Sequence, residues 1–395
     1  MKILAILTYY APHWTGLTMH AQRVAEGLAA RGHQVTVLTT RHSAALPRDE
    51  LLNGVRVVRL LPLARISRGM ISPAFPLAAA RLIREHDVVQ IHTPQLEALL
   101  VAGLCRLLRR PLLLTHHGDL VMPAGWFNQL VQRLVTGQMV LAGKLATAIS
   151  AYSRDYAGHS PFLRRFAGKL SYIYPPVELP APQPAEVERW RGELGLAGRP
   201  LVGFAGRFVE EKGFDYLLKA MPLVAAELPE ARFVFAGEHH IAYEDFYGRC
   251  LPLIERNRGR IVELGLLRDQ QRLANFYAMC DVFALPSRSD CLGMVQIESL
   301  LAGTPLVAAD IPGARVVVRE TGGGLLVAPH SPEALAAGLL AVLRQPAAYR
   351  ISRAAVERVF STSRTLSQYE AVFEALLAGR AEEARADGGA RRKRR

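Results

Sequence analysis

The sequence predicts an α/β protein of two domains that face each other across a cleft, each with a mostly parallel sheet covered by helices. At 395 residues the chain is too long for one ordinary domain. Short apolar runs alternate with longer amphipathic runs through both halves, which is typical of such sheets. A proline-rich stretch separates the halves, and half of the residues are hydrophobic, so each domain can bury its own core.

The first domain is predicted over residues 1–174. A helix is expected over Met19–Arg31, where Val24 and Leu28 lie at helical spacing and Gly32 ends the pattern. The expected strands are the short apolar runs Lys2–Leu7, Gln34–Thr39, Val55–Leu60, Val88–His92, Leu112–His116 and Leu145–Ser150.

A linker is predicted over residues 175–184, where five prolines stiffen the backbone and remove hydrogen-bond donors. The second domain is predicted over residues 185–360. A helix at about Thr365–Leu377, within residues 361–379, is expected to return to the first domain. Residues 380–395 lack a core pattern and are predicted to form a disordered basic tail. The expected strands of the second domain are Leu201–Ala205, Arg232–Ala236, Ile261–Leu264, Val282–Pro286, Leu306–Ala309 and Leu325–Val327.

The composition excludes several classes of protein. The four cysteines form neither a CxxC pair nor a cluster with histidines, which argues against a disulfide framework or structural zinc and favours a reducing compartment. The N-terminal apolar run is too short for a signal peptide, and Glu97 and Arg106 interrupt the most apolar stretch, Leu96–Leu108. A cytoplasmic location is expected, with peripheral contact to the inner membrane surface left open.

The net charge of +13 favours polyanionic partners, which include nucleotide phosphates, anionic lipid and nucleic acid. All five residues of 391–395 are basic, but the other basic residues are scattered. No aromatic-rich strand motif accompanies them, so nucleic acid is the least expected of these partners.

The most informative segment is Pro286–Gly313, because ligands of open α/β sheets bind beyond the carboxyl ends of the strands. A strand ends at Pro286, and a helix is expected from about Gly293. The free N–H groups of residues 292–294 at its N-terminus would attract a phosphate. Asp290 and Glu298 lie near the same helix end, where they could accept hydrogen bonds from sugar hydroxyls. The alternative is that Asp290 only caps the helix and Glu298 is solvated.

The second segment, Gly203–Gly213, places Arg207 and Lys212 in one loop after a buried strand. Two cations at a strand's carboxyl end can hold a diphosphate and stabilise the negative charge that grows on it as a bond breaks. The alternative is an ordinary ion pair of either cation with Glu210 or Glu211.

Two further loops follow strands of the first domain. In Thr8–His20, Gly16 would let the backbone approach a phosphate at the start of the next helix. His116, His117 and Asp119 follow a later strand and would face the cleft. Neither loop has the spacing of a metal motif, so no metal site is predicted.

Taken together, these segments resemble the retaining glycosyltransferase group 1 family. The resemblance runs from about residue 1 to residue 378 and includes PHWTGLTMHAQRVAEGLAARGHQVTVLT, THHGD, GRFVEEKG, ELGLL and the PS…E…AGTP block, in this order. It implies two Rossmann-like domains in the GT-B arrangement and a nucleotide-sugar donor, UDP- or GDP-linked, that binds between them.

The resemblance also implies roles for single residues. Arg207 and Lys212 match the pair that holds the donor diphosphate, and His117 matches a histidine that faces the transferred sugar. Asp290 matches the carboxylate that contacts the donor sugar, and Glu298 the one that contacts the ribose. Backbone contacts to phosphate, sugar or base are implied for Gly16, Leu266, Leu267, Gly293, Met294 and Val295.

Two positions depart from the family pattern. Asp290 stands where the family has Glu, which puts the contact to the donor sugar in doubt. Thr15 stands where it has Gly, so the N-terminal loop would be tighter or displaced. The family retains the anomeric configuration by same-face attack, in which the leaving phosphate takes the acceptor's proton. Neither a protein nucleophile nor a cofactor or divalent metal is then expected.

The acceptor is left open among lipid-linked, saccharide and small molecules. A lipid-linked acceptor would suit the arginines among apolar neighbours in the first half, although these could equally form a solvated face: Arg81, Arg84, Arg106, Arg109 and Arg110. Two alternative functions are a sugar-nucleotide epimerase of the same architecture and a basic nucleic-acid-binding protein.

Overall fold

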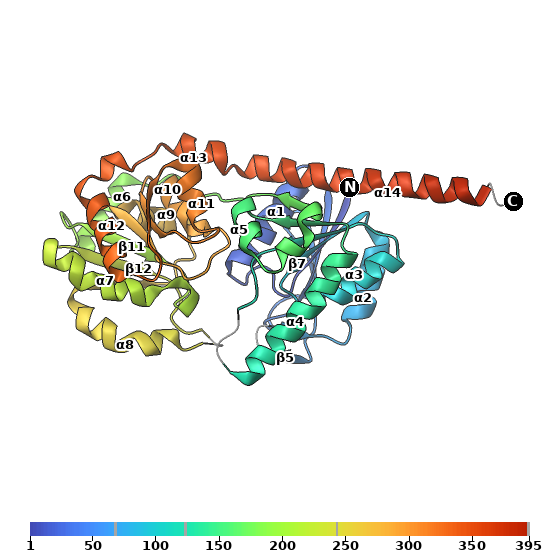
Figure 1. Ribbon diagram of the computed structural model, residues 1–395, viewed down its shortest axis with the longest axis horizontal. Coiled ribbons are helices and arrows are strands. Elements are labelled where there is room, and N and C mark those ends of the chain that lie inside the picture. The colour runs from blue at the N-terminus through green and yellow to red at the C-terminus, as the bar shows by residue number, and fades with distance from the viewer. Residues whose placement is uncertain (67–68, 122–124, 242–243, 393–395) are drawn as a thin grey trace. The chain divides into compact units, whose positions relative to one another are not determined.

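The computed structural model describes every residue except 67–68, 122–124, 242–243 and 393–395, and it divides the chain into two compact units (Figure 1). Unit 1 consists of Met1–Pro176 and Thr362–Arg395, and unit 2 consists of Val177–Ser361. The chain therefore passes from unit 1 to unit 2 inside the expected linker, and it returns to unit 1 at the start of the C-terminal helix.

Unit 1 is built on an eight-stranded sheet with the order β10-β9-β8-β7-β1-β2-β4-β3, parallel except for the edge strand β3. The central strands are buried along almost their whole length, as expected for strands covered on both faces. The chain starts in the middle at β1 and continues on one side with β2, and later on the other side with β7. The strands are β1 Lys2–Ile6, β2 Gln34–Thr40, β3 Asp49–Leu52, β4 Val55–Leu60, β7 Val88–Thr93, β8 Leu112–His116, β9 Ala148–Ala151 and β10 Leu170–Tyr172, with a separate hairpin of β5 Ala64–Ile66 and β6 Gly69–Ile71.

Helix α14, Thr362–Arg392, returns the end of the chain to unit 1. Its Tyr369 and Phe373 are buried in the core of that unit. Gly27 of α1 makes room for Leu366, because a Cβ at Gly27 would lie 2.6 Å from its Cδ1. The other helices of unit 1 are α1 Gly16–Ala30, α2 Phe75–Glu85, α3 Ala98–Leu107, α4 Trp126–Leu145 and α5 Arg154–His159.

The prediction of a disordered tail over 380–395 differs from the structure, in which α14 continues to Arg392. The segment is rich in alanine, glutamate and arginine, which are strong helix formers. Its helix also extends turns that are already packed, so no new nucleation is needed. Residues 393–395, the last part of the predicted tail, lie outside the described residues.

Unit 2 is built on a fully parallel sheet with the order β13-β12-β11-β14-β15-β16. Counted from β11, this is the order 3-2-1-4-5-6 of a Rossmann fold. Its core includes a cluster of phenylalanines around β11 and β12: Phe204, Phe208, Phe214, Phe233 and Phe235. The strands are β11 Leu201–Ala205, β12 Arg232–Ala236, β13 Ile261–Gly265, β14 Val282–Leu285, β15 Leu306–Ala309 and β16 Gly324–Val327.

The helices of unit 2 alternate with these strands along the chain. They are α6 Pro184–Glu193, α7 Phe214–Glu227, α8 Phe246–Asn257, α9 Gln270–Met279, α10 Met294–Leu301, α11 Arg315–Thr321, α12 Pro332–Arg344 and α13 Arg353–Val359. Among the described residues of both units, none of the helices combines the length and apolar content that a bilayer span requires.

The predicted α/β class with two parallel sheets is confirmed, and every predicted strand is present. The strand expected over Leu145–Ser150 begins only at Ala148, because α4 continues to Leu145. The strands that sequence reasoning missed are short and lie at a sheet edge or in the small hairpin: β3, β5, β6 and β10. Such strands carry no long apolar run, so the hydrophobic pattern gives little sign of them.

Candidate active site

The candidate site in unit 2 lies where β11 and β14 are neighbours in the sheet. The chain builds the sheet outward in one direction from β11 to β13 and then in the other direction from β14, so this is the topological switch point. Two loops leave the sheet there: residues 206–213 after β11, and residues 286–293 after β14. They contain both segments that the sequence analysis singled out in this half.

Lys212 and Asp290 join the two loops in one ion pair. The Nζ of Lys212 lies 2.6 Å from Oδ2 of Asp290, although 78 residues separate them along the chain. The Lys212 side chain is 22% exposed and that of Asp290 only 6%. Burial acts to lower the pKa of Lys212, but the carboxylates of Asp290 and Glu211 outweigh it and raise that pKa. Lys212 is therefore a permanent cation held at a fixed position.

Arg207 lies in the loop after β11, with Nη2 3.6 Å from Oε1 of Glu211. About a third of each side chain is exposed, so water screens this pair. The alternative of an ordinary ion pair within the loop therefore describes Arg207, while Lys212 pairs across to Asp290 instead.

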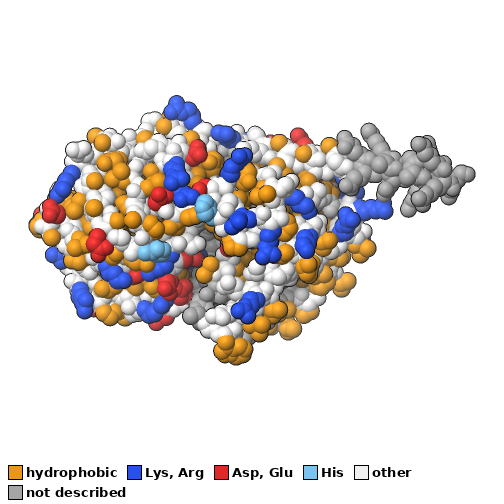
Figure 2. Space-filling view, in the orientation of Figure 1, with side chains coloured by type: hydrophobic (Ala, Val, Ile, Leu, Met, Phe, Trp, Pro, Cys, Tyr) orange, Lys and Arg blue, Asp and Glu red, His pale blue; other side chains and the backbone are white. Residues whose placement is uncertain are grey.

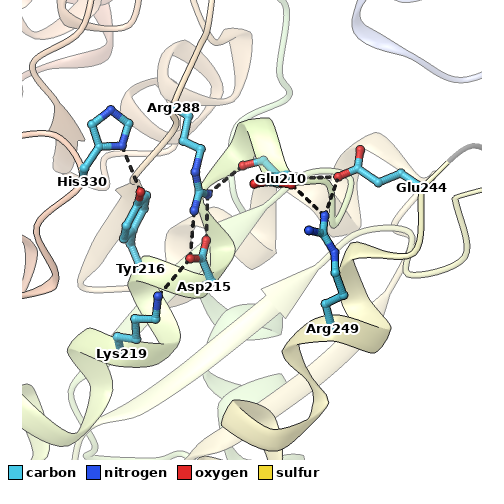
Figure 3. A network of polar contacts seen from close by, with 8 residues as sticks. All are labelled: Glu210, Asp215, Tyr216, Lys219, Glu244, Arg249, Arg288 and His330. Carbon is cyan, nitrogen blue, oxygen red and sulfur yellow. Dashed lines mark hydrogen bonds and ion pairs between the residues drawn. The ribbon is translucent and has the colours of Figure 1, made fainter. Parts of the chain in front are cut away.

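A second set of charges fastens the loop of residues 206–213 to its surroundings (Figure 3). Arg288 donates to both carboxylate oxygens of Asp215, at 2.7 and 2.9 Å, and to the backbone oxygen of Glu210 at 2.8 Å. Arg249 donates to Glu210 at 2.7 Å and lies 3.5 Å from Glu244. Burial acts to raise the pKa of Asp215, but the hydrogen bonds and charge of Arg288 lower it overall.

Backbone contacts fix the same two loops against each other. The N–H of Arg288 donates to the carbonyl oxygen of Glu211 at 2.8 Å. Gly213 has a φ of +66°, and a Cβ there would lie 1.9 Å from the carbonyl oxygen of Pro286. Only glycine fits this approach. Sequence reasoning missed Arg288 and Asp215, because nothing in their spacing shows that they meet.

Helix α10 begins at Met294, with Gly293 before it at a φ of +73°. Within the described residues, no side chain caps this helix end. The positive end of the helix dipole and its backbone N–H groups therefore remain available to an anion. Met294 and Val295 are half-buried in the first turn of this helix.

Glu298 is a buried carboxylate on α10, at 9% exposure. The hydroxyl of Tyr277 donates to its Oε2 at 2.8 Å, which leaves further acceptor capacity on the carboxylate. This excludes the alternative that Glu298 is merely solvated. Leu266 and Leu267 follow β13 on the same edge of the sheet, and Leu266 is exposed.

The candidate site in unit 1 centres on His117, directly after β8. Its Nε2 lies 2.8 Å from Nδ1 of His92, and its Nδ1 lies 2.5 Å from the hydroxyl of Tyr152. Burial, and then the nearby rings of His20 and His92, lower the pKa of His117 well below its ordinary value. His117 is therefore neutral at physiological pH, when one ring nitrogen donates and the other accepts.

His20 and His92 complete this group and were missed by sequence reasoning. His20 lies in α1 and His92 at the end of β7, so three segments far apart in sequence converge here. The ring of His20 lies 4.8 Å from that of His117, centroid to centroid. His20 Nε2 lies 3.1 Å from the hydroxyl of Tyr369 in α14.

The other predicted residues of this edge have local structural roles. Asp119 accepts hydrogen bonds from Ser160 at 2.9 Å and Tyr156 at 3.2 Å, and it lies 3.4 Å from His116. The carboxylate therefore anchors the loop after β8. Gly16 is exposed as the first residue of α1, and Thr15, which replaces the expected glycine, caps this helix together with Thr18.

Each of the two units matches a known family of glycosyltransferases. Residues 186–358 match the family model of glycosyl transferases group 1, and residues 14–179 match that of glycosyltransferase family 4. An uncharacterized glycosyltransferase of Methanocaldococcus jannaschii is 26% identical over 87% of this chain and 89% of the relative. The GDP-mannose-dependent alpha-(1-6)-phosphatidylinositol monomannoside mannosyltransferase of Mycolicibacterium smegmatis is 26% identical over 87% of this chain and 90% of that enzyme. The chain belongs to the group 1 glycosyltransferases.

The fold of this glycosyltransferase is shared with HepE of Anabaena, solved in complex with UDP and glucose. The TM-score is 0.77 at 21% identity, and the match covers 95% of this chain and all of HepE. The prediction of two Rossmann-like domains of the GT-B type is thereby confirmed.

The predicted site residues of the glycosyltransferase fall into one group in each unit. The structure brings Lys212 and Asp290 into contact and places the remaining members of their group on the same sheet edge. In unit 2 these are Arg207, Lys212, Leu267, Asp290, Gly293, Met294, Val295 and Glu298; in unit 1 they are Gly16 and His117.

Proposed function

We propose that the protein is a retaining glycosyltransferase that moves a sugar from a nucleoside diphosphate sugar to an acceptor hydroxyl, in the synthesis of a glycolipid, polysaccharide or other glycoconjugate. The observation that carries the proposal is the Lys212–Asp290 pair beside Arg207 at the switch point of unit 2. HepE was solved with UDP, and the Mycolicibacterium relative is named for GDP-mannose, so the donor is a UDP- or GDP-sugar.

The electrostatics of unit 2 suit a leaving nucleoside diphosphate. An ammonium group has three donors, so Lys212 can keep its bond to Asp290 and still donate to a phosphate oxygen. Arg207 supplies a fork of donors from the same loop, and the uncapped start of α10 adds backbone N–H groups. Negative charge that develops on the diphosphate thus meets donors that are already in place.

Asp290 and Glu298 of unit 2 bind different parts of the donor. Asp290 has one oxygen on Lys212, and its second oxygen is available for a hydroxyl of the donor sugar. Glu298 is held by Tyr277 and can accept hydrogen bonds from the ribose hydroxyls. Because Asp290 is tied to the cation, the sugar contact and the phosphate contact are coupled through a single ion pair.

The reaction proceeds with retention by attack on the face from which the diphosphate leaves, and the leaving phosphate takes the proton of the acceptor. His117, neutral and fixed by His92 and Tyr152, contacts the transferred sugar. Lys212 and Arg207 neutralise the diphosphate, so transfer needs no divalent metal. Excess chelator is expected to leave the rate of transfer unchanged.

A lipid-linked acceptor at an anionic membrane surface is supported by α4 of unit 1. Trp126, Leu130, Leu134 and Leu141 are all exposed and share one side of the helix. Arg133 and Lys144 are exposed on the same helix, and Figure 2 shows apolar and basic side chains intermixed on this part of the surface. An apolar stripe with cations beside it suits an interface with anionic lipid. We therefore propose a cytoplasmic, peripherally membrane-associated enzyme.

The two alternative functions are less favoured. A sugar-nucleotide epimerase would have to share this architecture, but both named relatives are glycosyltransferases. A nucleic-acid-binding protein would need its cations to form a tract, whereas Lys212, Arg288 and Arg249 are each paired with carboxylates.

Release of nucleoside diphosphate from a panel of UDP- and GDP-sugars, with lipid extract as acceptor, tests the proposed activity. One donor should be turned over, and NMR of the first-formed product should show the anomeric configuration of the donor. Conversion of a donor into its epimer without release of nucleoside diphosphate would support the epimerase instead. An inverted product would refute retention but not transfer.

A further inference from the structure

The carboxyl edge of the sheet in unit 1 holds three histidine side chains that offer ligand nitrogens to a common point. The rings of His20, His92 and His117 each supply a nitrogen, and these atoms all lie within 4.8 Å of one another. His92 Nδ1 and His117 Nε2 are already 2.8 Å apart. Tetrahedral coordination at about 2.0–2.1 Å requires nitrogens roughly 3.4 Å apart, so small rotations of the rings suffice.

His20 contributes a nitrogen that no protein group satisfies. Its side chain is fully buried, and Nδ1 has no hydrogen-bond partner among the described residues. A buried polar atom without a partner is costly, and native structures rarely keep one without a reason. The other nitrogen, Nε2, lies 3.1 Å from the hydroxyl of Tyr369, which leaves Nδ1 as the available ligand atom.

The groups around the cluster match those that surround metal-bound histidines. In such sites the second ring nitrogen is held by an outer hydrogen-bond partner, which fixes the tautomer and the ring orientation. Tyr369 provides that partner for His20, and Tyr152 provides it for His117 at 2.5 Å. His117 is only partly buried, which leaves solvent an approach to the cluster.

We propose that His20, His92 and His117 form a binding site for a transition-metal cation, Zn²⁺ foremost. Imidazole nitrogens suit Zn²⁺ and its neighbours in the first transition series, and three of them leave a fourth tetrahedral position open for water or an anion. Motif spacing does not reveal such a site, because the three ligands come from α1, β7 and the loop after β8.

The metal would act as an inhibitor of transfer rather than as a cofactor. This consequence rests on the proposed function, in which neutral His117 contacts the donor sugar. A bound Zn²⁺ would occupy Nε2 of His117 and fix its ring in the metal site. Transfer would then continue in excess chelator and fall when Zn²⁺ is added.

Calorimetric titration of the full-length, chelator-treated protein with zinc chloride tests the site directly. The wild type should bind one equivalent, and Co²⁺ should give the visible absorption of tetrahedral coordination. His20→Asn and His92→Asn should each abolish this binding. Tyr369→Phe, which keeps all three ligands and the packing of the ring, should weaken it by about ten- to a hundredfold. His159→Asn, at an exposed histidine of the same unit, should leave it unchanged.

Equal Zn²⁺ affinity in wild type, His20→Asn and Tyr369→Phe would overturn the site, as would no binding by the wild type at micromolar Zn²⁺. Circular dichroism identifies any variant that fails to fold. If a histidine variant does not fold, the Zn²⁺ affinity of Tyr369→Phe is the deciding measurement, because this variant keeps all three ligands. If Zn²⁺ binds as predicted but the turnover is unaffected, the metal site stands and the assigned contact of His117 with the donor is wrong.

Discussion

The carboxyl edges of the two sheets share a topology but differ in chemistry. In both, the chain reverses direction between neighbouring strands: β1 and β7 in unit 1, and β11 and β14 in unit 2. The edge in unit 2 carries opposite charges in contact, with Lys212 on Asp290 and Arg288 on Asp215. The edge in unit 1 carries neutral imidazoles bonded to one another and to tyrosine hydroxyls.

This difference shows how one fold can present two kinds of site. Fixed ion pairs keep a cation in place without a ligand, so an anionic diphosphate finds its partner already oriented. Neutral imidazoles offer hydrogen bonds and lone pairs without net charge, which suits sugar hydroxyls and metal cations. On this basis we propose that the phosphates of the donor bind at the edge of unit 2 and that unit 1 makes uncharged contacts.

The largest effect is expected from removal of a cation in unit 2. Arg207→Ala and Lys212→Ala should each lower kcat by about two to three orders of magnitude, the usual loss when one preorganised charge-stabilising donor is removed. Steady-state turnover with saturating donor measures this. Arg344→Ala removes an exposed arginine that pairs with Glu227 on the surface of the same unit, and it should change little. Near-normal turnover of both Arg207→Ala and Lys212→Ala would show that the diphosphate does not bind at this edge.

The next effect concerns the buried carboxylate of α10. Glu298→Gln keeps the volume of the side chain but loses the charged acceptor, so donor binding should weaken by roughly 1.5–3 kcal/mol. Calorimetry with the intact donor measures the change. Asp290→Glu, which restores the family residue, should be milder than Asp290→Ala, which leaves Lys212 without its partner. Equal donor affinity in wild type and Glu298→Gln would refute the ribose contact.

A smaller effect, caused by His92 of unit 1, is expected on the stability of the protein in acid. The pKa of His92 is about 3 in the folded protein and near 6.5 when unfolded, so between these values the unfolded chain binds more protons. The free energy of unfolding should therefore fall as the pH drops below 6.5, by at most about 1.4 kcal/mol per pH unit for this histidine. Urea unfolding between pH 7 and pH 5 measures the slope, which His92→Gln should flatten. The same slope in both proteins would show that His92 is not held neutral.

The effect most easily screened by salt is expected at the membrane surface. The basic residues of 391–395 should each contribute on the order of 1 kcal/mol to binding of anionic vesicles at low salt, and less at high salt. Removal of residues 380–395 should lower co-sedimentation with such vesicles but leave donor binding unchanged. Leu134→Glu in α4 should lower it further, because it places a carboxylate in the exposed apolar stripe. Unchanged co-sedimentation of both variants would show that neither the tail nor α4 binds the membrane.

Much of the fold followed from the sequence, because the central strands are buried on both faces and stand out as continuous apolar runs. The loops with candidate residues also followed, since each comes directly after such a strand. Residues 380–395 were predicted to be disordered because they lack a core pattern, but α14 continues through them to Arg392. The high helix propensity of these residues accounts for the difference.

The contacts within the sites could not be predicted in the same way. Lys212 meets Asp290, and His20 meets His117, only through the order of the strands in each sheet. The amino-acid sequence of one chain carries no signal of such pairs. Arg288 was missed for this reason, although it fastens the loop that carries Arg207 and Lys212.

The central claim is that the fixed cations of unit 2 hold the diphosphate of the donor. Calorimetric titration of wild type, Lys212→Ala and His117→Asn with UDP and with GDP tests this most directly. The wild type should bind one of the two nucleotides, and Lys212→Ala should bind it roughly ten- to a hundredfold more weakly, as expected for loss of a charged hydrogen bond. His117→Asn should bind it as the wild type does. Loss of binding in His117→Asn with normal binding in Lys212→Ala would contradict the account.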